Sequence, residues 1–67
     1  MDYEKLNELI AERGLKQRFI ANGMGISDKR LSILLNGGCW RMKEVVSFCQ
    51  LLKLTKRQRD EIFFANV

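Results

Sequence analysis

Residues 17–34, with the sequence QRFIANGMGISDKRLSIL, decide the fold of this chain. Ala21 would allow two helices to approach closely, and Gly25 supplies the positive φ with which a chain turns without strain. The apolar side chains fall at spacings that suit two helices crossing steeply around a tight turn: Ile20, Met24, Ile26, Leu31 and Leu34. We therefore expect a helix, a turn and a second helix that pack on one another through these residues.

The chain before and within this segment is predicted to be helical. Residues 2–13 carry apolar side chains at helical spacing, and Gly14 follows them as a C′ residue. The apolar stripe of this first helix consists of Tyr3, Leu6, Leu9 and Ile10. The central segment is expected to form helices over 16–23 and 28–35, with Ser27 as the N-cap of the second.

Two further helices are predicted downstream. One runs from residue 41 or 42 to about 52 and buries part of its apolar group: Val45, Val46, Phe48, Cys49 and Leu52. Thr55 can cap the other, over 56–65, whose apolar residues are Ile62, Phe63 and Phe64. Since the chain has no proline and no convincing strand, we expect a compact all-α domain of five helices, with residues 1–67 as a single unit.

Length and composition limit the class of protein. Sixty-seven residues make one small domain with a modest core. Its 46% hydrophobic and 30% charged residues are typical of a globular protein and argue against disorder. No apolar run approaches the roughly 18 residues that span a bilayer, and the acidic start is no signal peptide. We expect a cytoplasmic protein with no membrane contact.

The reactive side chains argue against an enzyme and against a metal site. The chain has no histidine, so Cys39 and Cys49 cannot complete a zinc shell. We expect both thiols to be reduced, with Cys49 in the core and Cys39 exposed. Neither thiol has an evident activating partner, and Asp28 has no second carboxylate beside it. We therefore predict no catalytic residue, no metal, no cofactor and no small-molecule ligand.

Positive charge is concentrated in the segment that contains the turn. Residues 14–43 carry six basic residues against one acidic residue, whereas residues 1–13 have a net charge of −2 and residues 44–67 a net charge of +1. The overall charge of +4 would be weak evidence alone. Its coincidence with the predicted pair of helices favours an anionic partner.

The chain resembles the DNA-binding domain of the phage repressor and Cro family, also called the Xre family. The resemblance covers nearly all of the chain and rests on GLKQ before the second helix, GIS opening the third, LNGG ending it, and LLKLT before the fifth. It implies a lambda repressor-like fold with a helix-turn-helix, whose third helix enters the major groove of double-stranded DNA. It also implies a sequence-specific transcriptional regulator, a repressor of bacterial or phage type, that binds a near-palindromic operator as a homodimer.

The resemblance implies roles for individual residues. Gln17 matches the glutamine with which the family holds a phosphate. Residues that match groove-facing positions, and are expected to read bases, are Ser27, Asp28, Lys29, Ser32 and Ile33. Residues expected to contact the DNA backbone are Lys16, Gln17, Arg30, Asn36, Arg41 and Lys43. Residues expected at the dimer interface are Trp40, Phe63 and Phe64.

Some of these residues also have a purely structural interpretation. Asp28 either accepts a hydrogen bond from cytosine or only stabilises the start of its helix. Ile33 either meets a thymine methyl group or packs against the fourth helix or a partner subunit. Trp40 covers the core, lies along a DNA backbone or joins a dimer contact. Of the adjacent Phe63 and Phe64, a short helix can bury only one well, so the other is expected to face a partner.

The chain departs from the family pattern at several positions. Phe19 stands where the family usually has an exposed polar residue. Ile10 and Leu35 stand where several relatives pair an arginine with a glutamate, so an apolar contact is expected instead. Gly23 weakens the second helix for no reason visible in the sequence beyond turn flexibility. Two other functions on the same fold stay open: the antitoxin of a toxin–antitoxin pair, and a protein-interaction adaptor.

Overall fold

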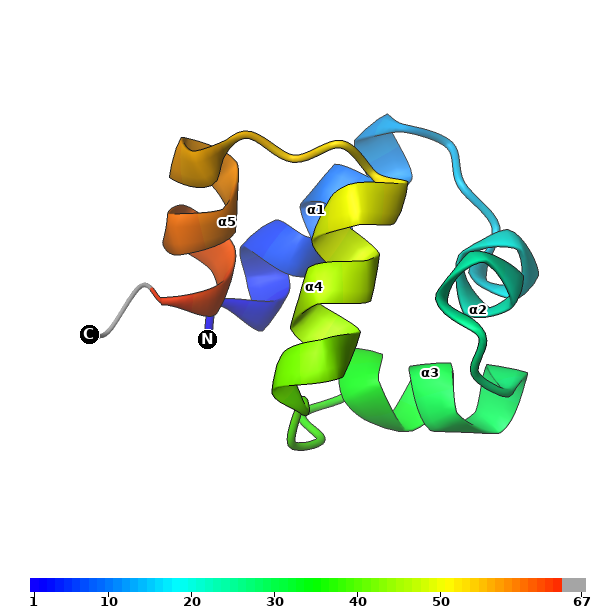
Figure 1. Ribbon diagram of the computed structural model, residues 1–67. Coiled ribbons are helices and arrows are strands. Elements are labelled where there is room, and N and C mark those ends of the chain that lie inside the picture. Colours follow the sequence, from blue (N-terminus) through cyan, green and yellow to red (C-terminus); the bar gives the residue numbers. More distant parts are fainter. Residues whose placement is uncertain (65–67) are drawn as a thin grey trace.

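The computed structural model describes residues 1–64, which form five helices and no strand (Figure 1). The helices are α1 (Tyr3–Glu12), α2 (Gln17–Met24), α3 (Asp28–Leu35), α4 (Met42–Leu51) and α5 (Lys56–Phe63). The all-α fold class is therefore confirmed, and the predicted bounds of α3 agree with those observed. The predicted end of the last helix, residue 65, lies outside the described residues. Within residues 1–64, no helix has the length and apolar character needed to cross a bilayer.

Local side chains define where helices begin and end. Oγ of Ser27 accepts a hydrogen bond from the N–H of Arg30 at 3.0 Å and caps α3. The hydroxyl of Thr55 caps α5 in the same way, at 3.1 Å from the N–H of Gln58. Gly25 ends α2 with a φ of 73°, in the left-handed conformation that the turn requires. The predicted roles of Ser27, Thr55 and Gly25 are confirmed.

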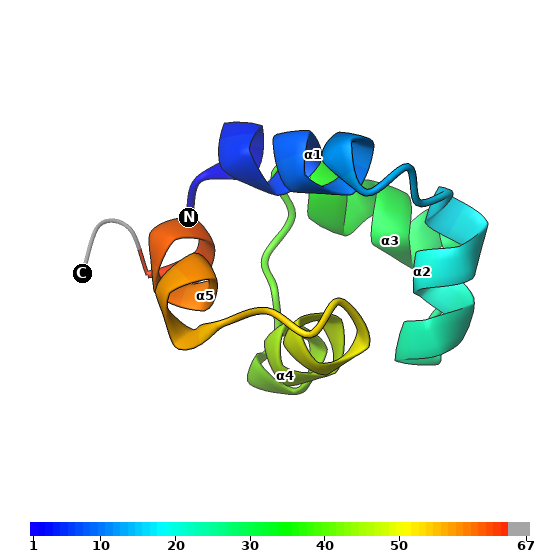
Figure 2. The same ribbon diagram turned by 90° about the horizontal axis from the view of Figure 1, so that it is seen from above.

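The helices surround one apolar core. In Figure 2, α1 and α3 lie on one side of the molecule, α4 lies on the other, and α2 and α5 close the two ends. The largest fully buried side chains come from all helices except α5 and from the residue after α4: Leu6, Ile20, Leu31, Leu34, Phe48 and Leu52. Ile10 and Leu35 belong to the same core, as expected for an apolar replacement of the ion pair.

Trp40 closes the core from the segment between α3 and α4. Its ring centroid lies 5.4 Å from that of Phe48 and 5.0 Å from that of Phe63, both in edge-on geometry. Its Nε1–H donates a hydrogen bond to the carbonyl oxygen of Leu34 at 3.0 Å. The Phe63 ring is thus buried in the core of its own chain, and the dimer contact predicted for it stays a prediction. Phe64, which is 36% exposed, remains accessible.

Gly23 has a packing role that the sequence did not reveal. A Cβ atom at this position would lie 2.6 Å from both Cδ atoms of Leu51. The missing side chain therefore lets α2 approach the C-terminal end of α4. This close approach explains the glycine better than turn flexibility does.

The two ends of the described chain are joined. The backbone N–H of Asp2 donates a hydrogen bond to the carbonyl oxygen of Ile62 at 2.7 Å. Figure 1 accordingly shows the N-terminus beside the end of α5, away from α2. The helix α5 is thus held both by its apolar residues in the core and by the start of α1.

Candidate nucleic-acid interface

A short turn sets α3 against α2. After Gly25, the N–H of Ile26 donates a hydrogen bond to the carbonyl oxygen of Ala21 at 3.0 Å, and Ser27 starts the next helix. In Figure 1, α3 runs along the lower edge of the molecule, and no other element of residues 1–64 covers its lower side. One side of α3 is consequently open to solvent.

The open side of α3 carries the predicted base-reading residues. Leu31, Leu34 and Leu35 turn into the core, which fixes the rotation of the helix. On the opposite side, three side chains lie one, four and five positions after Asp28, a pattern that falls on one helix face, and the N-cap Ser27 precedes them. We call this exposed set the α3 surface: Ser27, Asp28, Lys29, Ser32 and Ile33. Ile33 is 47% exposed and so remains available to a partner.

Asp28 has an ion-pair partner on α2. Its Oδ2 lies 3.7 Å from Nε of Arg18, and both side chains are more than half exposed. An acidic side chain in the first turn of a helix is also favoured by the helix dipole. The carboxylate nevertheless stays on the accessible α3 surface, where its charge is partly balanced by Arg18.

Basic and amide side chains flank the α3 surface. Lys16 and Gln17 are exposed at the start of α2, a helix end without a side-chain cap, so its first N–H groups are open to solvent or to a ligand. Arg41 and Lys43 line a groove of about 330 Å³ between the α2–α3 turn and α4. Asn36 is exposed, but its side-chain N–H donates a hydrogen bond to the carbonyl oxygen of Ser32 at 2.7 Å.

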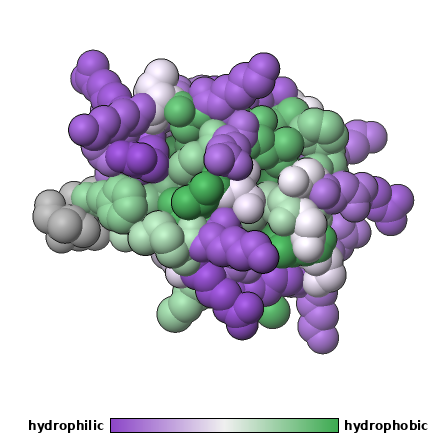
Figure 3. Space-filling model, in the orientation of Figure 1, coloured by the Kyte–Doolittle hydropathy of each residue, from purple (hydrophilic) through white to green (hydrophobic). Residues whose placement is uncertain are grey.

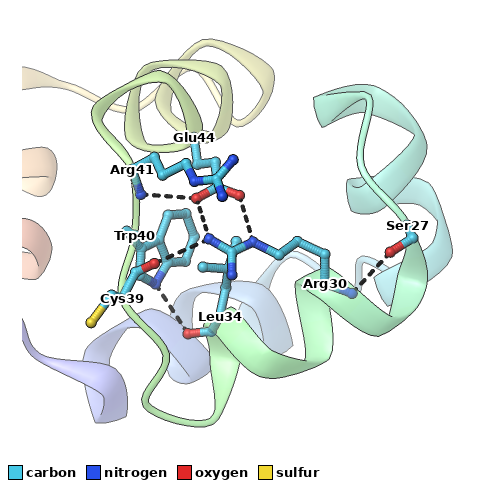
Figure 4. A network of polar contacts seen from close by, with 7 residues as sticks. All are labelled: Ser27, Arg30, Leu34, Cys39, Trp40, Arg41 and Glu44. Atoms are coloured by element: carbon cyan, nitrogen blue, oxygen red, sulfur yellow. Dashed lines mark hydrogen bonds and ion pairs between the residues drawn. The ribbon is translucent and has the colours of Figure 1, made fainter.

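Arg30 does not join these residues, although it lies on α3. Figure 4 shows its guanidinium turned toward α4. Nε donates to Oε2 of Glu44 at 2.9 Å, and Nη2 donates both to Oε1 of Glu44 at 2.9 Å and to the carbonyl oxygen of Cys39 at 3.2 Å. These bonds engage the Nε and Nη2 edge of the Arg30 guanidinium within its own chain, and the phosphate contact predicted for Arg30 stays a prediction.

Glu44 is the buried partner in this pair. Only 7% of the residue is exposed, and its Oε1 also accepts the backbone N–H of Arg41 at 2.8 Å. The hydrogen bond from Arg30 outweighs the effect of burial and lowers the pKa of the Glu44 carboxyl, while Glu44 raises the pKa of the Arg30 guanidinium. Both groups therefore remain charged at neutral pH.

A second surface feature lies between α4 and α5. Met42, Val46 and Phe64 are 66%, 46% and 36% exposed, and they converge there. We call this hollow of about 440 Å³ the α4–α5 groove; its lining residues are Met42, Val45, Val46, Cys49, Gln50, Arg59 and Phe64. Figure 3 shows hydrophobic atoms gathered over this part of the molecule. The α4–α5 groove is therefore a second candidate surface beside the α3 surface.

Metal-binding side chains and thiols are a third possible kind of site. Within residues 1–64, no three His, Cys, Asp or Glu side chains are placed to hold a metal ion. Cys39 is exposed, and Cys49 is half-buried beside the core. Burial raises the pKa of the Cys49 thiol.

Comparison with known proteins assigns the chain to a family. Residues 1–66 match the family described as "Protein of unknown function (DUF739)", and the chain belongs to this family. No curated protein and no solved structure matches it. Since the family description names no activity, the function has to be argued from the two surfaces described above.

Proposed function

We propose that this protein is a sequence-specific transcriptional regulator in which α2 and α3 form a helix-turn-helix of the phage repressor and Cro type. The observation that carries the proposal is the α3 surface. It is the uncovered face of a short helix that follows a tight glycine turn, and basic residues lie on its flanks. The major groove of B-DNA admits an α-helix of this size, and the second helix of such a pair reads base edges there.

The α3 surface offers chemically distinct groups for base recognition. The ammonium group of Lys29 suits O6 and N7 of guanine, and the carboxylate of Asp28 suits the amino group of cytosine. The hydroxyl of Ser32 both donates and accepts, and the exposed methyl groups of Ile33 suit the methyl group of thymine. These four side chains would give the protein its preference for one half-site.

The flanking residues would hold the DNA backbone. The open N–H groups at the start of α2, together with Lys16 and Gln17, favour a phosphate. Arg41 and Lys43 would bind further along the same strand. Each phosphate neutralised by a basic residue contributes a slope of about 0.9 to the decrease of log K with log salt.

The α4–α5 groove supports a homodimer as the binding form. A second copy would cover Met42, Val46 and Phe64, which are costly to leave in water. Trp40 also lines a neighbouring hollow with Met42 and Phe64, so the edge of its ring would lie close to such a contact. Two α3 helices related by a two-fold axis would read half-sites about 34 Å apart on a near-palindromic operator.

Selection from a random duplex library at near-physiological salt, followed by sequencing, tests this proposal. The wild-type chain should enrich a palindrome with half-sites one helical turn apart. Lys29→Ala should relax the preference at one position of each half-site, whereas Lys56→Ala, at an exposed position of α5, should leave the enriched sequence unchanged. Recovery of no preferred sequence would contradict the proposal.

The dimer is tested separately by sedimentation. Val46→Asp places a charge in the α4–α5 groove at a half-exposed position, so the fold should survive. If the groove is the dimer contact, this variant should sediment as a monomer at concentrations where the wild-type chain is dimeric. If the Val46→Asp variant remains a dimer, the dimer contact lies on another surface.

A further inference from the structure

Arg30 occupies an unusual place on α3. It lies between Lys29, on the exposed surface, and Leu31, which is fully buried. Its side chain is only 30% exposed and leaves the helix toward the start of α4. A basic residue in the first turn of α3 is therefore withheld from the surface that would meet an anionic ligand.

The fork of hydrogen-bond donors on Arg30 is used within the chain. Nε and Nη2, the edge of the guanidinium that suits a two-oxygen acceptor, bind both carboxylate oxygens of Glu44. Nη2 also binds the carbonyl oxygen of Cys39, so the same group reaches the segment between α3 and α4. A phosphate could take this edge only if it displaced a buried carboxylate, which would then be left without its charge partner.

The far end of α3 is fixed by a different side chain. The Trp40 indole donates to the carbonyl oxygen of Leu34, near the end of the helix, while its ring packs on Phe48 and Phe63. Figure 4 shows two hydrogen bonds between α3 and the segment that follows it, one from Arg30 to the carbonyl oxygen of Cys39 and one from Trp40 to that of Leu34. Arg30 thus holds the first turn of α3, and Trp40 holds the last.

Hydrogen bonds have preferred directions, so they restrict the rotation and sliding of α3 more than apolar packing does. A leucine stripe selects the buried side of a helix, yet it tolerates some rotation and sliding. Side-chain tips lie about 5–6 Å from the helix axis, so a rotation of about 20° moves them by about 2 Å. Such a shift breaks hydrogen bonds to base edges, which need donor–acceptor distances of about 2.7–3.2 Å. Attraction to phosphates would survive it.

We propose that Arg30 is a positioning residue: through its two bonds to Glu44 it sets the rotation of α3 for base reading, and it does not bind phosphate. This inference rests on the proposed function. Buried ion pairs are poor sources of stability, and their best-attested use is to select one arrangement of packed elements. The Arg30–Glu44 pair has the geometry for this use, since it joins two separate helices through two hydrogen bonds to one carboxylate.

The test compares binding to the selected operator with binding to an unrelated duplex over a range of salt concentrations. Arg30→Lys keeps the charge and loses the fork, so the ratio of the two affinities should fall at least about tenfold, the value of one lost base contact. The salt slope on the unrelated duplex should stay unchanged. Lys16→Gln should lower that slope by about 0.9, and Lys56→Gln should change neither quantity. An Arg30→Lys variant with a wild-type ratio would overturn the proposal.

A double variant covers the case in which single variants lose stability. Arg30→Met with Glu44→Met replaces the pair by apolar side chains of similar size, which should recover stability relative to Arg30→Met alone. It should not recover the affinity ratio. Hydrogen exchange should show faster exchange for the N–H groups of α3 than in the wild type, with α1 unchanged.

The exchange measurement also separates the two proposals. If the wild-type chain prefers no DNA sequence, the proposed function fails, and the exchange rates alone still decide whether the pair fixes α3. If the double variant keeps both the wild-type affinity ratio and the wild-type exchange rates in α3, the pair fixes nothing and the inference is wrong.

Discussion

Gly25→Ala is the substitution with the clearest physical expectation. The residue has φ 73° and ψ 29°, and a Cβ atom there would meet nothing within 4 Å. The cost is therefore conformational and not steric. A left-handed conformation costs an L-residue about 1–2 kcal/mol. The alanine also restricts the unfolded chain, which offsets about 0.4–1 kcal/mol. We expect a net loss of about 1 kcal/mol in the free energy of unfolding.

Urea and thermal unfolding followed by circular dichroism measure this loss. For a domain of this size, 1 kcal/mol lowers the Tm by about 4–8 °C. Gly25→Asn should lose less, because asparagine enters the left-handed region more readily. Gly14→Ala is a matched control, since Gly14 has φ 62° and also has open space around it. The Gly14→Ala variant should lose a similar amount of unfolding free energy, although Gly14 lies between α1 and α2 and not in the turn before α3.

Two results would refute this reasoning. A Gly25→Ala variant with an unchanged Tm would mean that the turn accepts another conformation at no cost. A Gly25→Asn variant as unstable as Gly25→Ala would mean that the loss does not arise from the left-handed backbone.

Three further predictions concern packing and charge. Gly38→Ala should cost about 1–3 kcal/mol in urea unfolding, because its Cβ would lie 2.6 Å from the backbone oxygen of Ile33; a smaller loss would show that the loop can shift. Phe48→Ala should cost about 3–5 kcal/mol, enough to unfold much of a small domain, whereas Phe64→Ala should change thermal stability little; equal effects would contradict the assigned burial. The urea midpoint of the wild type should fall as the pH drops below 4.5, the ordinary pKa of glutamate, because Glu44 binds a proton more readily in the unfolded chain than in the folded one. The Glu44→Gln variant should lack this part of the decrease.

Local signals made the α2–α3 unit predictable. Three signals act within a few residues of one another: the N-cap Ser27, Gly25 in the turn, and the helical spacing of the leucines. The observed bounds of α3 agree with them. The exposed set on α3 follows directly, because burying one side of a helix determines which residues lie on the other. The candidate site was for this reason largely predictable once the helix was placed.

Contacts between distant segments were not predictable in this way. Arg30 and Glu44 lie on different helices, so neither charge identifies its partner in the sequence. Val45 and Val46 are adjacent and equally apolar, and only the packing of α4 decides that Val45 is buried and Val46 exposed. The need for a glycine at position 23 arises only from the close approach of Leu51 on α4. Each case depends on how the helices meet rather than on how they form.

The hydrogen bond between Asp2 and Ile62 has a consequence for engineering. The start of α1 lies beside the end of α5. A peptide that joins the end of one copy to the start of the next would therefore attach to both copies at this same end of the fold. Two copies fused in tandem would keep α2, at the other end of the molecule, clear of the tether (Figure 1). Such a single-chain pair would have one effective concentration of subunits regardless of dilution, which would turn a weak association into an intramolecular one.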